Sequence, residues 1–271
     1  MVRRRYATTC TSVQMRILME NGPVVVDIEQ LRRSCGACAL HELCLPAGID
    51  RNELERLDSA VRDKRTLDRG KLLFRQGDAF NALYVVRSGS LKTFVENADG
   101  EVQVLGFVLP GEILGVAALV NDRHPMTAEA MERSSICELP YTQLQQIVGE
   151  LPALHRQLMR VISREVVADN SHLVMMGRQH AQERLAIFLQ SLADRHARLS
   201  RDAGALTLSM SRYDIANYLG LVVETVSRLF SRMEAAGILA VNRKSVRILR
   251  PDLLAQLCGS HAAAARRGEA G

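Results

Sequence analysis

The chain has 271 residues, with 35 Lys and Arg against 30 Asp and Glu, and 47% of its residues are apolar. This length predicts two domains, the apolar content excludes wholesale disorder, and no apolar run reaches the roughly 18 residues of a membrane span. The basic excess lies at one end: residues 178–271 hold 14 Lys and Arg against 8 Asp and Glu, whereas residues 1–177 hold 21 against 22. A basic C-terminal third favours a polyanion as partner, although a solvated charged surface explains it equally well.

The first residues carry no motif. Residues 1–29 show no sustained period, and we expect an N-terminal extension that is partly disordered. No apolar segment follows the arginines at 3–5, so a cleaved secretory signal is not expected. We therefore expect a cytoplasmic protein without membrane attachment, in which six cysteines indicate metal or redox chemistry rather than disulfides.

Three cysteines lie close together in the pattern Cys-x2-Cys-x5-Cys: Cys35, Cys38 and Cys44. Thiolates at these spacings can hold one inorganic centre from a single loop, and a four-cysteine iron–sulfur cluster needs one more ligand. Cys137, at the end of a strand pattern, is the candidate; zinc with His41 as fourth ligand is the alternative. Spacing does not choose between them. Cys10 and Cys258 have no companion, and we expect them to be ordinary thiols.

A short helix is predicted over 50–64 from apolar residues at helical spacing, and residues 66–140 then read as short strands separated by turns. The expected strands cover 72–74, 83–86, 91–95, 102–108 and 134–139. Asp99-Gly100 predicts a hairpin between two of them. Many short strands at close spacing predict an antiparallel roll, so residues 30–150 are expected to form a sensor domain of cysteine loop and β-roll.

A long helix is predicted over 152–178, inside a linking unit at 151–178. Its apolar seam consists of Leu158, Ile162, Val166, Asp169, Leu173 and Met176. The spacings of three and four residues are typical of a two-stranded coiled coil, and about 1.5 Å per residue gives a length of about 40 Å. The pattern favours a dimerisation helix; a helix packed on its own domain is the alternative.

The segment 212–231 matches a helix-turn-helix inside a second, mostly helical domain at 179–258, which a tail at 259–271 follows. Ala216 is the small residue where two helices approach, Gly220 the turn, and Val226 the apolar residue that docks the second helix. The second helix presents Glu224, Thr225, Ser227 and Arg228, which suit base edges in a major groove. A strand is predicted at 245–249, and Gly237-Ile238 with Lys244-Ser245-Val246 resemble a wing that returns to the DNA backbone. An ordinary helical hairpin is the alternative, but the local charge favours DNA binding.

Together these motifs resemble the FNR/CRP family of bacterial transcription regulators, and most closely its oxygen-responsive FNR members. The resemblance covers residues 30–258 and includes the four cysteines, Gly77-Asp78, Ser88-Gly89, Pro110-Gly111-Glu112, Asn217-Tyr218-Leu219-Gly220 and the run from Val223 to Arg228. It implies an α+β fold: an N-terminal antiparallel β-roll of the cyclic-nucleotide-binding type, a long dimerisation helix and a C-terminal winged helix-turn-helix.

The resemblance also implies a function. A 4Fe-4S cluster on Cys35, Cys38, Cys44 and Cys137 is implied, which decides between cluster and zinc where spacing could not. It implies an oxygen-sensing activator that is not an enzyme. At low oxygen it acts as a homodimer on double-stranded DNA, at a palindrome resembling TTGAT…ATCAA. Val223, Glu224, Ser227 and Arg228 are the implied DNA-binding residues.

Further expectations concern ligands and partners. By an ungapped comparison, Val116 and His124-Pro125 stand where cyclic-nucleotide-binding relatives carry a Glu and an Arg-Ser pair, so no cyclic nucleotide is expected. The loop from Glu96 to Glu101, with Asp99 and Gly100 at its tip, resembles the family surface that contacts RNA polymerase, although an exposed tip is polar for solubility alone. Asp169 would meet its own copy across a two-fold axis, where two carboxylates repel.

Two other functions are compatible with parts of the sequence. An electron-transfer or redox enzyme would need a substrate site, and the sequence shows no Gly-rich phosphate loop and no nucleophile triad. A CRP-family regulator that contains zinc, or no metal, and senses another signal remains the alternative function.

Overall fold

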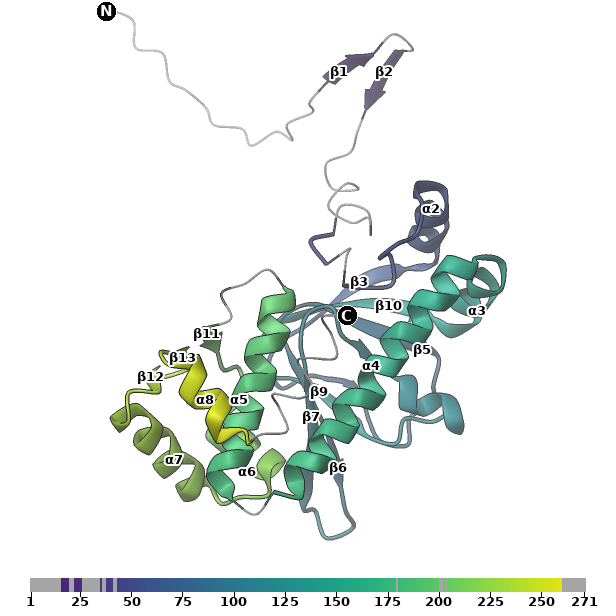
Figure 1. The fold of residues 1–271 in the computed structure, drawn as a ribbon. Helices are drawn as coiled ribbons and strands as arrows, with labels where there is room; N and C mark the ends of the chain where they lie inside the picture. The colour runs from purple at the N-terminus through teal and green to yellow at the C-terminus, as the bar shows by residue number, and fades with distance from the viewer. Residues whose placement is uncertain are drawn as a thin grey trace, which may run out of the picture.

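The computed structural model describes residues 16–19, 22–25, 35, 38–40, 43–178, 180–199, 202 and 204–259. The molecule consists of an antiparallel β-roll, a long helix beside it and a smaller, mostly helical domain (Figure 1). This arrangement confirms the predicted α+β class. The expectations for Cys10, for His41 and for the tail beyond Gly259 lie outside the described residues.

Two four-stranded antiparallel sheets form the roll. One has the order β3 (Arg62–Leu67), β10 (Ser134–Pro140), β5 (Ala82–Ser88) and β8 (Ile113–Leu114). The other has the order β4 (Leu72–Phe74), β9 (Thr127–Ala130), β6 (Leu91–Glu96) and β7 (Val102–Val108). The predicted hairpin joins β6 to β7, with Gly100 at a positive φ of 79°.

Strand β5 is buried on both faces, which explains its continuous apolar run. Successive side chains of a strand point to opposite faces, so Tyr84 and Val86 fill the space between the two sheets, whereas Leu83 and Val85 face the helices. The same alternation on β10 sends Ile136 into the roll and Cys137 toward the helices.

Three helices cover that outer face: α2 (Arg51–Ala60), α3 (Tyr141–Glu150) and α4 (Pro152–Met176). Asp50 begins α2 with a reciprocal capping box to Glu53. The helix predicted over 50–64 is therefore too long, because β3 begins at Arg62 and pairs with β10. Val61 continues the apolar spacing of the helix but packs against the core from an extended conformation.

Helix α4 changes its surroundings along its length. Leu154, Leu158 and Val161 are buried against the roll, and the end of the helix reaches the second domain (Figure 1). Beyond residue 162 the helix is exposed over most of its length. The first half of α4 therefore packs on its own domain, as the alternative interpretation expected. The second half carries an apolar surface that no described residue covers.

The second domain combines helices with a small sheet. Its helices are α5 (Ala181–Arg198), α6 (Arg212–Leu219), α7 (Val223–Ala235) and α8 (Pro251–Leu257). Its antiparallel sheet has the order β11 (Ala205–Thr207), β13 (Ser245–Ile248) and β12 (Leu239–Asn242). The sequence analysis predicted β13 and missed β11 and β12, which are 3 and 4 residues long.

Smaller elements complete the description. Strands β1 (Arg16–Met19) and β2 (Gly22–Val25) pair as a hairpin, which the sequence did not predict for the extension. A 3-10 helix, η1, covers Val116–Val120. Of the helices that the structure describes, none is both long and apolar enough for a bilayer crossing.

The two domains share one hydrophobic core. Val104, Phe107, Leu109 and Met131 of the roll belong to the same buried cluster as the apolar residues of α5, α6 and α7. Phe107 lies with its ring centroid 5.1 Å from that of Tyr218 on α6. The roll therefore supports the second domain through packed side chains as well as through the chain connection at α4.

Candidate cysteine pocket and DNA-reading surface

Four cysteines gather where the roll meets α2. Cys35, Cys38, Cys44 and Cys137 line one pocket, together with Arg87 and with apolar residues that include Leu40, Leu45, Leu57, Val61, Val85 and Leu139. The structure thus brings together the three cysteines of the loop and the distant fourth. Cys137 is opposite Val85 in the register of β10 and β5, and both face the helices and not the roll interior.

The loop that carries the first three cysteines is held by short-range hydrogen bonds. The backbone N–H of Cys38 donates to the carbonyl of Cys35 at 3.2 Å, and that of Cys44 donates to Leu40 at 3.0 Å. Cys35 is tied to α2, because its backbone N–H donates to Asp58 at 2.5 Å. Leu45, 1% exposed, anchors the end of the loop in the core.

The pocket favours neutral thiols when nothing balances their charge. Burial raises the pKa of Cys44 to about 12. Burial also raises the pKa of Cys35, and a hydrogen bond with Asp58 raises it further. Among the described residues, no three His, Cys, Asp or Glu side chains form a ready metal-binding set, although four cysteines line the pocket. The donors suit a sulfur-ligated centre, whose positive charge would stabilise thiolates there.

The helix-turn-helix is built as its sequence predicts. Ser211 caps α6 with a reciprocal capping box to Asp214. Gly220 ends the helix at a positive φ of 61°, and a Cβ there would lie 2.9 Å from the Cε atom of Met176. Ala216 and Val226 are buried at 1% and 0% exposure, so they hold the two helices together.

Helix α7 has a buried face and an exposed face. Val226, Leu229, Phe230 and Met233 pack inward. Glu224, Ser227 and Arg228 are exposed, while Val223 and Thr225 are half-buried beside them. The side chains predicted to read bases therefore lie on the open surface of the second helix, which is the helix that enters the major groove in this motif.

A wing follows the recognition helix. Strands β12 and β13 form a hairpin whose two-residue connection is Arg243-Lys244, and Arg243 has a positive φ of 53°. Arg243, Lys244 and Arg247 are all exposed. This hairpin places basic side chains beside α7, in agreement with the basic excess of the sequence.

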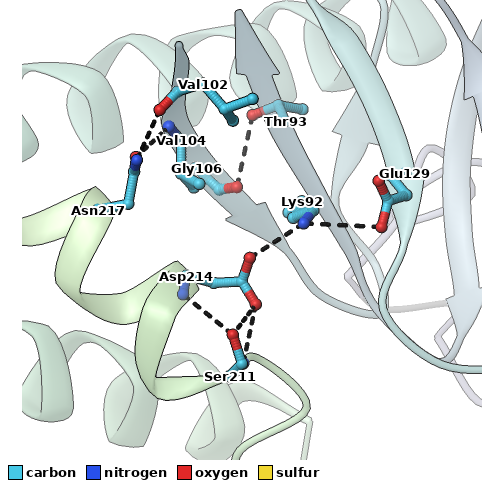
Figure 2. Close-up of polar contacts among 9 residues, drawn as sticks. All are labelled: Lys92, Thr93, Val102, Val104, Gly106, Glu129, Ser211, Asp214 and Asn217. Atoms are coloured by element: carbon cyan, nitrogen blue, oxygen red, sulfur yellow. Dashed lines mark hydrogen bonds and ion pairs between the residues drawn. The ribbon is translucent and has the colours of Figure 1, made fainter. Parts of the chain in front are cut away.

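Helix α6 docks on the outer strand of the roll (Figure 2). The side chain of Asn217 accepts the backbone N–H of Val104 and donates to the carbonyl of Val102, each at 2.6 Å. Because β7 is an edge strand, Asn217 satisfies backbone groups that an edge leaves unpaired. Lys92 on β6 donates to Asp214 at 3.0 Å and lies 3.6 Å from Glu129.

A charged junction links the roll, α4 and α5. Arg195 of α5 donates to Glu112 at 2.7 Å through Nε and to the carbonyl of Phe107. Burial raises the pKa of Glu165 to about 7, an effect that the charges of Glu112 and Asp169 increase and that of Arg195 opposes. Glu112, which belongs to the Pro-Gly-Glu motif, therefore connects the roll to the second domain.

From Met159 to its C-terminal end, α4 carries an exposed apolar surface that we call the α4 stripe: Met159, Val166, Val167, Leu173, Val174 and Met176. Met159, Val166 and Leu173 are seven residues apart, as are Ile162, Asp169 and Met176, which gives a coiled-coil pattern with one charged position, Asp169. Leu158, placed in the seam from sequence, is 7% exposed and belongs to the core. Met159 takes its place in the stripe, which only the burial of Leu158 shows.

Inside the roll, His124 is buried at 3% exposure. Its ring stacks on Phe74 at 3.7 Å between centroids and meets the edge of Phe80 at 5.8 Å. Burial lowers the pKa of His124, against a smaller opposite effect of Asp78. The ring is therefore neutral near pH 7 and is part of an aromatic cluster.

The chain is similar in sequence to known protein families and to known proteins. The model of the cyclic nucleotide-binding domain matches residues 64–151, and that of the Crp-like helix-turn-helix domain matches residues 183–257. The transcriptional activator protein Anr of Pseudomonas protegens is 44% identical over 83% of this chain and 92% of its own length. The fumarate and nitrate reduction regulatory protein of Escherichia coli K12 is 38% identical over 83% of this chain and 90% of its own. These relatives are transcription regulators and not enzymes.

A solved structure agrees with the fold. FixK2 from Bradyrhizobium japonicum superposes with a TM-score of 0.67 at 27% identity, covering 73% of this chain and 98% of that one. The match supports one arrangement of roll, long helix and helix-turn-helix in both proteins.

Proposed function

Because the chain belongs to the Crp/Fnr family of transcription regulators, we propose that this DNA-binding regulator senses oxygen through an iron–sulfur cluster and acts as a homodimer. One observation carries the proposal: four cysteines line a single pocket in a chain similar to the regulator of fumarate and nitrate reduction. The working units are a sensor domain at 30–150, a dimerisation helix at 151–178 and a DNA-binding domain at 179–258.

The pocket residues fit a 4Fe-4S cluster. Cys35, Cys38, Cys44 and Cys137 supply four sulfur ligands, and apolar walls limit the access of water. When bound, such a cluster supplies an oxygen-labile centre. The protein itself holds Cys35 near α2 through Asp58 and presents Cys137 from β10. Ligation would thereby fix the cysteine loop to the roll.

DNA recognition is assigned to the exposed face of α7. Arg228 suits guanine, Glu224 suits the amino group of cytosine, and Ser227 accepts several partners. Val223 offers an apolar contact at the start of the helix. A dimer of such helices reads two half-sites about one helical turn apart, which agrees with a palindrome resembling TTGAT…ATCAA.

Dimerisation is assigned to the α4 stripe. Six large apolar side chains are exposed along it, and four of them, Met159, Val166, Leu173 and Met176, follow the heptad spacing of a two-stranded coiled coil. Asp169 interrupts the pattern and is exposed at the position that would meet its own copy. Repulsion between the two carboxylates leaves the dimer marginal, so a modest contribution from the sensor domain can decide its formation.

No cyclic nucleotide is assigned to the roll. The neutral His124 stacks on Phe74, lies edge-to-face with Phe80 and offers no positive charge to a phosphate. Val116 adds no carboxylate. The hairpin tip at Asp99 and Gly100 is exposed and is assigned as a contact for RNA polymerase on the family resemblance.

The decisive experiment combines a spectrum with DNA binding. Protein purified without oxygen is expected to contain iron and acid-labile sulfide, to absorb visible light, and to shift a TTGAT…ATCAA duplex. Exposure to air should bleach the spectrum and weaken the shift.

Matched serine variants make this test specific. Cys137→Ser should abolish both the spectrum and the shift, whereas Cys258→Ser, at a cysteine buried in the second domain, should keep both. Zinc without visible absorption would contradict the cluster and favour the zinc-containing regulator. Equal DNA binding with and without air would contradict oxygen sensing.

A further inference from the structure

Two side chains of helix α4 donate hydrogen bonds to the end of the cysteine loop, and we call this pair of contacts the grip. Gln157 donates from Nε2 to the carbonyl of Cys44 at 3.0 Å. Arg164 donates from Nη1 to the carbonyl of Leu43 at 3.4 Å. The two residues are seven positions apart and therefore lie on the same side of the helix. The last turn of the loop thus lies along α4 between Gln157 and Arg164.

Gln157 is unusual in its surroundings. It is 3% exposed on the face of α4 whose neighbours Leu154, Leu158 and Val161 form the apolar core. A buried amide is costly unless it is hydrogen-bonded, and an apolar residue of similar size would pack there without that requirement. The bond that satisfies Gln157 ends on Cys44, a lining residue of the cysteine pocket.

The grip lies where α4 changes from core helix to exposed helix. Met159 and Val166 of the α4 stripe alternate in sequence with Gln157 and Arg164. A displacement of the loop carbonyls would therefore shift the helical turns that carry the first residues of the stripe.

A second contact leads from the same loop toward the DNA-binding domain. A Cβ on Gly111 would lie 3.5 Å from the Cβ of Leu43, so the loop packs directly on the Pro-Gly-Glu turn. The next residue, Glu112, accepts from Arg195 of α5. Leu43 and Cys44 thus both accept hydrogen bonds from the helix that carries the stripe, and Leu43 also packs against the turn that holds the second domain.

We propose that Gln157 and Arg164 are positioning residues that couple the state of the cysteine pocket to the alignment of α4 for dimerisation. This inference rests on the proposed function and adds the contacts through which the cysteine pocket would act on α4. A cluster held by Cys44 would fix the carbonyls of the loop, which would keep Gln157 hydrogen-bonded and α4 in place. Without the cluster the loop would be free to move, and the buried amide of Gln157 would lose its partner unless α4 shifted.

The test measures coupling, using full-length protein reconstituted with iron and sulfide under nitrogen and then exposed to air. Sedimentation gives the dimer dissociation constant of both forms, and their ratio is the coupling. Gln157→Met, a variant of similar volume, is expected to keep the visible spectrum while the ratio shrinks about tenfold, the effect of one buried hydrogen bond.

Controls separate this role from a structural one. Arg164→Met tests the exposed half of the grip without disturbing the core, and it should also reduce the ratio, whereas Arg160→Met, an exposed arginine one turn earlier, should not. Arg164→Lys, which keeps a donor, should retain part of the coupling. Variants that weaken dimers equally in both forms, with the ratio unchanged, would overturn the proposal.

The outcome for the unmodified protein tests the premise separately. If its ratio is large and neither Gln157→Met nor Arg164→Met changes it, the positioning role is wrong while oxygen sensing stands. If the unmodified protein shows no cluster spectrum, or the same dimer constant in both forms, the proposed function fails and the coupling fails with it.

Discussion

Gly89 shows how single positions constrain the roll. Its φ of +79° lies in the left-handed region, and an added Cβ would lie 2.3 Å from the Oγ atom of Ser134 and 2.7 Å from the carbonyl oxygen of Arg133. Gly77 has a similar φ of +86° but no atom within 4 Å of the added Cβ. A side chain at Gly77 would therefore meet only backbone strain, whereas a side chain at Gly89 would meet both strain and steric overlap.

Alanine at these two positions should have different costs. Gly77→Ala is expected to lower the free energy of unfolding by about 1–2 kcal/mol, the strain of a left-handed alanine. Gly89→Ala adds overlap with backbone and should cost about 1–3 kcal/mol more. Urea titration of both variants measures the difference, and equal midpoints would contradict the steric part.

The charge of Asp214 is a second feature at this scale. Burial alone would raise the pKa of Asp214, but hydrogen bonds from Ser211 and Lys92 outweigh burial and lower it below its ordinary value. A lowered carboxyl pKa adds stability above the pKa of the unfolded chain, about 4, and this stability is lost as pH falls through the folded value.

A double-mutant cycle on Lys92 and Asp214 should therefore depend on pH. With Lys92→Met and Asp214→Asn, we expect a coupling of about 1–2 kcal/mol at pH 7 that begins to decline below about pH 4 and is lost as the pH falls through the lowered pKa of Asp214. The exposed pair Arg250 and Asp252 is the matched control and should show no measurable coupling. A coupling for Lys92 and Asp214 that persists at low pH would argue against this account.

At the scale of elements, local patterns predicted most of the architecture. The hairpin at Asp99-Gly100, the long helix from Pro152 and the helix-turn-helix with its turn at Gly220 all depend on spacing and turn chemistry within a few residues. Where short-range signals conflicted, as at Val61, the sequence prediction extended the helix into β3.

Contacts between distant elements could not be predicted in this way. Gln157 and Cys44 are 113 positions apart, and nothing in either neighbourhood indicates a bond between an amide and a loop carbonyl. Asn217 belongs to a sequence motif, but its hydrogen bonds to the edge strand β7 depend on the folded arrangement of the two domains. The four cysteines were assigned together by resemblance, and the alternation of β10 explains why Cys137 faces the loop.

The α4 stripe gives a prediction for this long element. Asp169→Ala removes the carboxylate that would meet its own copy and extends the apolar heptad. The variant is expected to dimerise and bind the palindrome in air, with a dimer dissociation constant at least about tenfold lower than that of the unmodified protein in air. Sedimentation measures this directly, and a monomeric variant in air would argue against the stripe as interface.

For the whole molecule, the junction of roll, α4 and α5 predicts a pH effect. Because the pKa of Glu165 is raised to about 7 in the folded chain but lies near 4 when unfolded, burial of its charge costs stability that is absent below about pH 4 and complete above about pH 7. Glu165→Gln should thus raise the melting temperature at pH 8 more than at pH 5. The three charged neighbours, Glu112, Asp169 and Arg195, remain in the variant. The same increase at both pH values would contradict a buried charge at this position.

The core that the roll shares with the second domain also sets how the chain melts. Separating the domains would expose Phe107 and Leu109 together with their partners on α5 and α6, and it would leave Arg195 without Glu112. Neither part can therefore lose its structure without destabilising the other, and heating should produce one cooperative transition. By the same reasoning, a fragment beginning near residue 179 would expose to water the apolar surface of α5 and α6 that the roll covers. The second domain thus depends on the roll for its solubility as well as for its stability.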